Sequence, residues 1–118
     1  MIGFDWSEYM ELAERMIECP KLPEEAMRRS AVSRAYYAAL HTLLERASRD
    51  YGYHIMHNSG DHGLLREHLK KNRMANVANS LGQLHLMRKQ CDYDDTVPNL
   101  QVIYEPALRS AKKLMSQL

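Results

Sequence analysis

One uninterrupted stretch constrains the fold of this chain more than any other feature. Between Pro23 and Gly52 there is no glycine or proline, and Pro23 suits the first position of a helix. Small side chains in a helix let neighbouring helices approach closely. A helix over residues 23–50, central to a bundle, is therefore predicted. The small residues at its centre are Ala31, Ser33, Ala35, Ala38 and Ala39.

Further helices are predicted on both sides of this stretch. Residues 5–18 carry apolar residues at steps of three and four, with Asp5 or Ser7 as a cap. The segment 51–63 is predicted to be a loop, followed by a short helix over 62–71 that Asp61 caps. Two more helices are expected, from 72 or 74 to 93 and from 98 or 99 to 117. Pro106 either kinks the last helix or marks a late start.

These segments favour one fold class. A chain of 118 residues fits one domain, and its 45% hydrophobic and 26% charged residues are ordinary for a globular protein. The sequence has no strand alternation and no internal repeat. We therefore predict a single domain over residues 1–118, all-α, folded as an up-and-down antiparallel bundle of four to five helices.

Charge and targeting signals narrow the classes of function. A formal net charge of +1 argues against strong nonspecific binding of nucleic acid, although a local basic cluster can coexist with it. The N-terminus lacks the features of a signal peptide, and no apolar run approaches the ~20 residues of a membrane span. A cytoplasmic protein without a membrane association is predicted, with Cys19 and Cys91 as reduced thiols.

A polar row on the central helix is the first candidate site. Arg34, Tyr37 and His41 are spaced i, i+3, i+7, and Ser30 extends the same face. Polar groups inside an Ala-rich helix need partners. The row can face a phosphate, with Arg34 as a clamp and His41 as acid or base. Alternatively it is a structural network, in which Arg34 pairs with a carboxylate and His41 with a carbonyl.

Two other segments carry titratable groups. Arg88 and Asp92 are four residues apart and can pair, and the acidic run that follows is better explained as a solvated turn than as a cation site. The loop histidines lack the partners of a tetrahedral zinc site. No metal and no cofactor are therefore predicted. His62 stands at a helix start, which favours an anion.

Three stretches together resemble the HEPN superfamily, specifically its small stand-alone bacterial and archaeal members. They are Phe4–Tyr9, which leads into an amphipathic helix, then Arg29–His41, with the string RSAVSRAYYAALH, and Arg88–Asp94, which contains Arg-x-x-x-Asp-Tyr. With the order of helices, the resemblance covers almost the whole chain. The second stretch is the most specific.

The resemblance implies a helical bundle that dimerises and, in active members, a metal-independent ribonuclease. Such enzymes use an Arg followed after four to six residues by His, and the motifs of two subunits meet in a cleft. The RNA 2′-hydroxyl attacks the adjacent phosphate while His transfers a proton and Arg stabilises charge. Many members are toxins or phage-defence factors, often partnered with a minimal nucleotidyltransferase antitoxin.

This sequence departs from the motif after Arg88, where Tyr93 and the two aspartates after it occupy the positions expected for His. Arg34 and His41 satisfy the spacing but lie within a helix. Either the ribonuclease site is degenerate, or His41 or His62 supplies the imidazole through space. Tyr93 titrates near 10 and is a poor base at neutral pH.

The leading hypothesis is a HEPN-type module of a toxin–antitoxin or phage-defence system that acts on RNA or a nucleotide. The alternative is a non-catalytic HEPN subunit, regulatory or scaffolding, that binds a nucleotide or a nucleotidyltransferase; a plain structural bundle is the third. The catalytic candidates are Arg34, His41, Arg88 and Tyr93, and the ligand-binding candidates are Ser30, Tyr37, His62 and Asp92.

Overall fold

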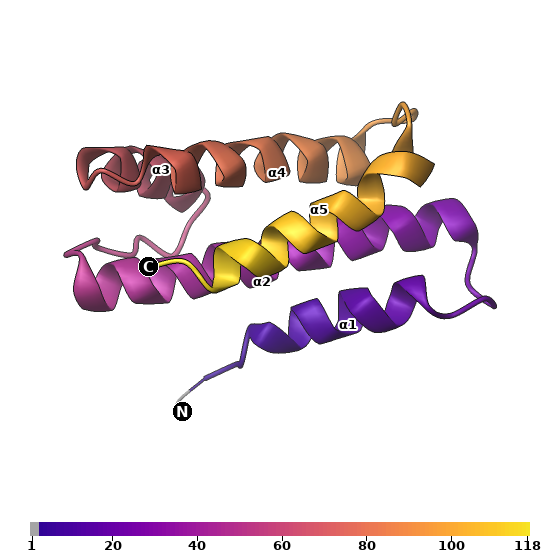
Figure 1. The fold of residues 1–118 in the computed structure, drawn as a ribbon, viewed down its shortest axis with the longest axis horizontal. Coiled ribbons are helices and arrows are strands. Elements are labelled where there is room, and N and C mark those ends of the chain that lie inside the picture. Colours follow the sequence, from indigo (N-terminus) through magenta and orange to yellow (C-terminus); the bar gives the residue numbers. More distant parts are fainter. Residues whose placement is uncertain (1–2) are drawn as a thin grey trace.

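Five helices carry the fold in the computed structural model, which describes residues 3–118 (Figure 1). The first, second, fourth and fifth helices along the chain run alternately up and down, and the third lies against one end of the fourth. No strand occurs within residues 3–118, so the predicted all-α bundle is confirmed. No helix in that range is both long and apolar enough to cross a membrane. The helices are α1 (Ser7–Ile17), α2 (Glu24–Asp50), α3 (Asp61–Lys71), α4 (Ala75–Tyr93) and α5 (Leu100–Met115).

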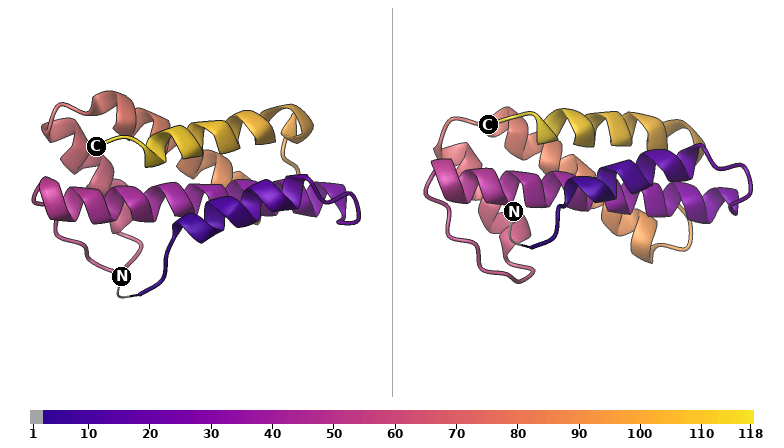
Figure 2. Two further views of the ribbon diagram at one scale, coloured as in Figure 1. Left: turned by 60° about the horizontal axis from the view of Figure 1, so that its bottom comes forward. Right: turned by 90° about the horizontal axis from the view of Figure 1, so that it is seen from below.

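Helix α2 occupies the centre of the bundle, as predicted. It packs against all four other helices, and the turned views show it running through the middle of the molecule (Figure 2). Five of its six alanines have almost no exposed surface, so the neighbouring backbones lie close to it. The alanines that are at most 1% exposed are Ala31, Ala35, Ala38, Ala39 and Ala47.

Two arginines of α2 donate hydrogen bonds to carbonyl oxygens at the C-terminal ends of other helices. Arg29 donates to the carbonyl oxygens of Cys91 (3.2 Å), Asp94 (2.5 Å) and Asp95 (2.9 Å), where α4 ends. Arg46 donates to the carbonyls of Met115 and Gln117 at the end of α5. The last carbonyls of a helix lack partners inside the helix and carry partial negative charge, so a guanidinium stabilises them.

Two local expectations need correction or completion. Asp61 does not cap α3: it is the first residue of that helix, and its carboxylate accepts hydrogen bonds from the preceding loop. Helix α5 begins at Leu100 and continues through Pro106, so Pro106 does not mark a late start. Proline has no N–H for the carbonyl four residues earlier, that of Val102, and Val102 is 63% exposed, where water can reach it.

Both cysteines are free, and Cys91 belongs to the core. Burial raises the pKa of the Cys91 thiol to about 11, so it stays protonated at neutral pH. A protonated, buried thiol acts as a small apolar side chain rather than as a nucleophile.

Close packing around α2 predicts that enlarging a buried alanine is costly. Ala35→Leu should lower the free energy of unfolding by about 1–3 kcal/mol, because a larger side chain must displace packed neighbours. Ala26→Leu is the matched control, since Ala26 is exposed on the same helix. Urea unfolding followed by circular dichroism measures both. Equal stability of the two variants would contradict the close packing.

Candidate functional site

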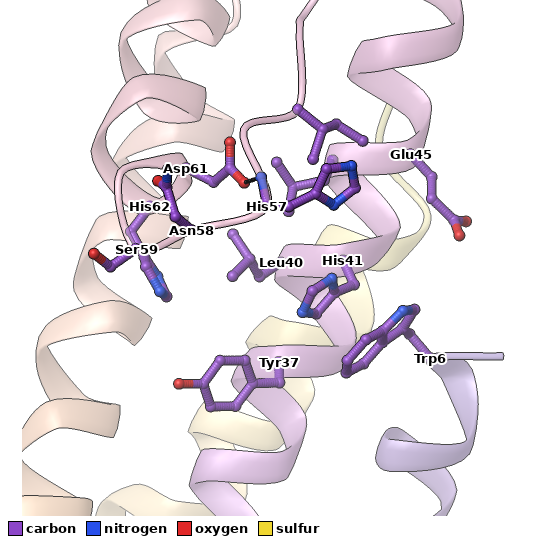
Figure 3. A pocket seen from close by; sticks show the side chains of 12 residues that line it. Trp6, Tyr37, Leu40, His41, Glu45, His57, Asn58, Ser59, Asp61 and His62 are labelled. Atoms are coloured by element: carbon purple, nitrogen blue, oxygen red, sulfur yellow. Dashed lines mark hydrogen bonds between the residues drawn. The ribbon is translucent and has the colours of Figure 1, made fainter. Parts of the chain in front are cut away.

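A pocket of about 560 Å³ lies between α2, the loop before α3 and the segment before α1 (Figure 3). Aromatic rings and imidazoles form much of its wall. Cavities of this size, with a few polar groups on apolar walls, are typical of small-molecule sites. Its lining residues are Trp6, Tyr37, Leu40, His41, Leu44, Glu45, Ile55, His57, Asn58, Ser59, Asp61 and His62.

Tyr37 and His41, one turn apart on α2, form one wall of this pocket. The indole of Trp6 stacks on His41, with ring centroids 3.5 Å apart and planes 9° from parallel. The ring of Tyr37 lies 6.3 Å from that of His41 and 6.3 Å from that of His62. The helix therefore presents a tyrosine between two imidazoles, one from its own face and one from α3 (Figure 3).

Arg88 of α4 packs on the same tyrosine. Its guanidinium carbon lies 4.9 Å from the ring centre of Tyr37 and 5.4 Å from that of Tyr93, within the range of cation–π attraction. Its Nε lies 2.8 Å from Oδ2 of Asp92, which also accepts a hydrogen bond from Ser33 Oγ at 3.1 Å. The predicted pair of Arg88 and Asp92 is present as an ion pair.

A buried tyrosine sets the tautomer of His62. The hydroxyl of Tyr36 lies 2.5 Å from His62 Nδ1, and Tyr36 has no exposed surface. Among the described residues this nitrogen is the one partner of that hydroxyl, so the hydroxyl must donate or leave its hydrogen unsatisfied. His62 Nδ1 is then the acceptor, and the hydrogen of the neutral ring is on Nε2. Burial raises the pKa of Tyr36, which keeps it a donor.

A second imidazole, His85 of α4, stacks on His62 with ring centroids 4.6 Å apart. Arg66 Nη1 lies 3.0 Å from His85 Nδ1. A guanidinium can only donate, so Nδ1 of His85 is the acceptor and its ring is also the neutral Nε2–H form. Burial and then nearby positive groups lower the pKa of His85 to about 4, in agreement with this assignment.

Neutral imidazoles and permanent guanidinium charges together define the electrostatics of the site. Burial lowers the pKa of both His41 and His62, and in His62 the positive charges of Arg88 and Arg66 lower it further. At neutral pH the histidines are therefore unprotonated on one nitrogen, and the arginines carry the positive charge. This combination can bind an anionic group and accept a proton close to it.

The carboxylate of Asp61 holds the loop that closes one side of the pocket. It accepts hydrogen bonds from the Tyr53 hydroxyl at 2.7 Å and from the amides of Met56 and His57, both at 2.9 Å. Burial alone would raise the pKa of Asp61, but these bonds outweigh it and leave the pKa below its ordinary value. His57 has a φ of 60°, a conformation that this anchoring supports.

The sequence candidates divide into two groups in the structure. Tyr37, His41 and His62 line the pocket, and Arg88, which contacts Asp92 and Tyr93, joins them through its contact with the Tyr37 ring. Arg34 lies instead toward α1, with its guanidinium 5.0 Å from the ring centre of Tyr9, and Ser30 does not line the pocket. Ser33, one turn from Ser30, makes the contact to Asp92.

The acidic run and the loop histidines serve the fold and the pocket. Asp94 and Asp95 offer their carbonyls to Arg29. His54 is exposed, while His57 and His62 line the pocket. Within residues 3–118 no three His, Cys, Asp or Glu side chains gather as metal ligands.

Sequence reasoning missed His85 and Arg66. A signal for both exists: His85 is three residues before Arg88 on α4, and Arg66 is four residues after His62 on α3, so each pair shares a helix face. The contact between the two faces depends on how α3 packs against α4.

Comparisons with known proteins name no activity. The chain is 30% identical over 108 residues to an uncharacterized protein of Methanocaldococcus jannaschii, a match that covers 77% of this chain and 61% of the relative. This chain thus spans less than two thirds of the length of that relative. No family model matches the sequence, and no solved structure matches it.

The depressed pKa of His85 predicts acid sensitivity of the fold. Between pH 6.5, its ordinary pKa, and about 4, the unfolded chain binds a proton that the folded chain does not. The free energy of unfolding should therefore fall as pH drops through this window. His85→Gln, which keeps an acceptor for Arg66, should reduce that slope, and His54→Gln should not. Urea unfolding at several pH values measures it; an unchanged slope in His85→Gln would refute the assignment.

The role of Asp61 predicts a large effect from an isosteric change. Asp61→Asn should lower the free energy of unfolding by about 2–4 kcal/mol, because an amide is a weaker acceptor for three donors than a carboxylate. Amide hydrogen exchange at Met56 and His57 should become faster. Asp50→Asn is the control, since Asp50 is exposed and its ion pair is with the neighbouring Arg49. A loop that is as protected in Asp61→Asn as in the wild type would exclude this anchoring role.

Proposed function

We propose that this chain is a HEPN-like module that cleaves single-stranded RNA without a metal, at the pocket lined by Tyr37, His41 and His62, with Arg88 packed on Tyr37. One observation supports the proposal above the others. An imidazole from the start of α3 and a guanidinium from α4 pack on the same Tyr37 ring, although no histidine follows Arg88 in the chain. In the motif, an arginine and a histidine are close together because they are close in the sequence. In this chain the two groups come from different helices and are brought together by packing.

In the proposed reaction the 2′-oxygen of a nucleotide attacks the adjacent phosphorus. His41, neutral at the working pH, accepts the proton of the 2′-hydroxyl. The bond from phosphorus to the 5′-oxygen breaks, and the proton passes from His41, directly or through water, to that oxygen. The products are a 2′,3′-cyclic phosphate and a 5′-hydroxyl, so atoms and charge balance.

Arg88 and His62 stabilise the charge that builds up on the phosphorane. Arg88 is held by Asp92 and packs on two tyrosines, so its guanidinium does not need to reorganise when charge develops. The Nε2–H of His62 provides a neutral donor beside it. In this proposal Tyr93 and Asp92 are positioning residues, and Arg34 has a structural contact with Tyr9.

The proposed function also implies a biological setting and binding partners for this chain. We propose that the module works in a toxin–antitoxin or phage-defence system, as a homodimer, with a nucleotidyltransferase as its antitoxin. Tyr93, near the end of α4, is 72% exposed, and its ring centre lies 5.4 Å from the guanidinium carbon of Arg88. A second copy that packs on Tyr93 would bury this ring next to Arg88.

The test is cleavage of a defined single-stranded RNA in EDTA, with analysis of the product ends. Wild type should leave cyclic phosphate and 5′-hydroxyl ends. His41→Ala should slow cleavage about 10²-fold or more, because it removes the base. Arg88→Lys should also slow it, because the planar fork is lost while the charge stays. His54→Gln, an exposed histidine of the neighbouring loop, should cleave as wild type does.

Folded wild type without cleavage, or cleavage that needs a divalent metal, would refute the proposal. A second candidate, a non-catalytic nucleotide-binding subunit, is favoured by the aromatic wall of Trp6 and Tyr37 in a cavity of about 560 Å³. This second candidate requires that the protein binds a mononucleotide, as measured by calorimetry, and does not cut RNA. Arg88→Lys should weaken that binding.

A further inference from the structure

A basic groove of about 520 Å³ lies between α3 and α4 and adjoins the candidate site through the stack of His62 and His85. No carboxylate lines this groove. Its three cations form no ion pair within residues 3–118. The polar residues that line it are Arg66, Lys70, Asn79, Gln83, His85 and Lys89.

Positive and negative residues are unevenly distributed along the chain. Residues 61–93, which form α3, α4 and their connection, contain six Lys and Arg against three Asp and Glu. The remaining residues contain ten Lys and Arg against twelve Asp and Glu. The net charge of +1 therefore conceals a positive segment, and local positive charge rather than the total attracts phosphates.

The two helices present their donors as facing rows. Arg66 and Lys70 are four residues apart on α3, and His85 and Lys89 are four residues apart on α4. The side chain of Arg66 lies over Gly82 of α4, where a Cβ would be 3.4 Å from Cδ of Arg66. Arg66 thus lies across α4, and its Nη1 contacts Nδ1 of His85.

We infer that this groove binds the sugar–phosphate backbone of the single-stranded RNA whose scissile phosphate lies at Arg88. The inference rests on the proposed function, which supplies the RNA. Arg66 and Lys70 on α3 and Lys89 on α4, three cations without an ion pair within residues 3–118, match a chain of regularly spaced phosphates. An acidic protein fits less well, because protein interfaces rely on a buried apolar or aromatic centre, and Leu86 is the one large apolar side chain in the lining.

The test measures binding without cleavage. The probe is a fluorescent single-stranded 2′-O-methyl RNA, which lacks the attacking hydroxyl, titrated by anisotropy at several salt concentrations. The groove variant is Lys70→Gln with Lys89→Gln. The control is Lys21→Gln with Lys113→Gln, which makes the same change in net charge at exposed lysines outside the groove.

Loss of two phosphate contacts should lower the salt slope of log Kd by about 1.4 and raise Kd roughly tenfold or more at 0.1 M salt. The control variant should keep both values close to those of wild type. Equal Kd and slope in the two variants, or no binding by wild type, would overturn the inference. If wild type binds poly-glutamate as tightly as the RNA, and the groove variant loses that binding, RNA is not the specific occupant. The groove would then be assigned to an acidic protein.

Failure of the proposed function has a different signature. A wild type that binds the methylated RNA through the groove, but never cuts unmodified RNA, would refute the ribonuclease and leave the groove as an RNA-binding surface. If wild type cuts RNA and the groove variant binds and cuts RNA equally well, the proposed ribonuclease activity stands and the proposed RNA-binding role of the groove is refuted.

Discussion

The close packing of α2 is the constraint on which the rest of the structure depends. Its alanines allow neighbouring helices to approach, and its length lets Arg29 and Arg46 reach the ends of α4 and α5. The same helix carries Tyr37 and His41, so one wall of the pocket belongs to the helix at the centre of the core. A site built on such a helix loses little entropy when it binds a ligand, because its side chains are already positioned.

Burial also decides the charge state of the site. Each imidazole is partly removed from water and faces other imidazoles or guanidiniums, and both effects disfavour its protonation. The hydroxyl of Tyr36 and the guanidinium of Arg66 then select the tautomers of His62 and His85. The result is a group of bases that stays neutral beside permanent positive charge, an arrangement that suits an anionic substrate.

The helices could be predicted from the sequence because glycine, proline and apolar spacing act locally. The site could be predicted only in part. Spacing placed Arg34 on the face of Tyr37 and His41, but Tyr9 from α1 contacts Arg34 from outside that helix. His85 was missed because its partners belong to α2 and α3. Asp61 was predicted to cap α3, but it is the first residue of that helix and its carboxylate binds amides of the preceding loop, a contact that no local rule predicts.

The stack of His62 and His85 connects two regions that the sequence keeps apart. Arg66 binds His85 on the side of the groove, and Arg88 lies near His62 on the side of the pocket. A phosphate at either guanidinium would offset part of the positive charge that lowers the pKa of these histidines. Occupation of the groove would therefore make protonation easier in the pocket. By reciprocity, proton uptake in the pocket would strengthen the binding of phosphate in the groove, so the two regions form one electrostatic unit.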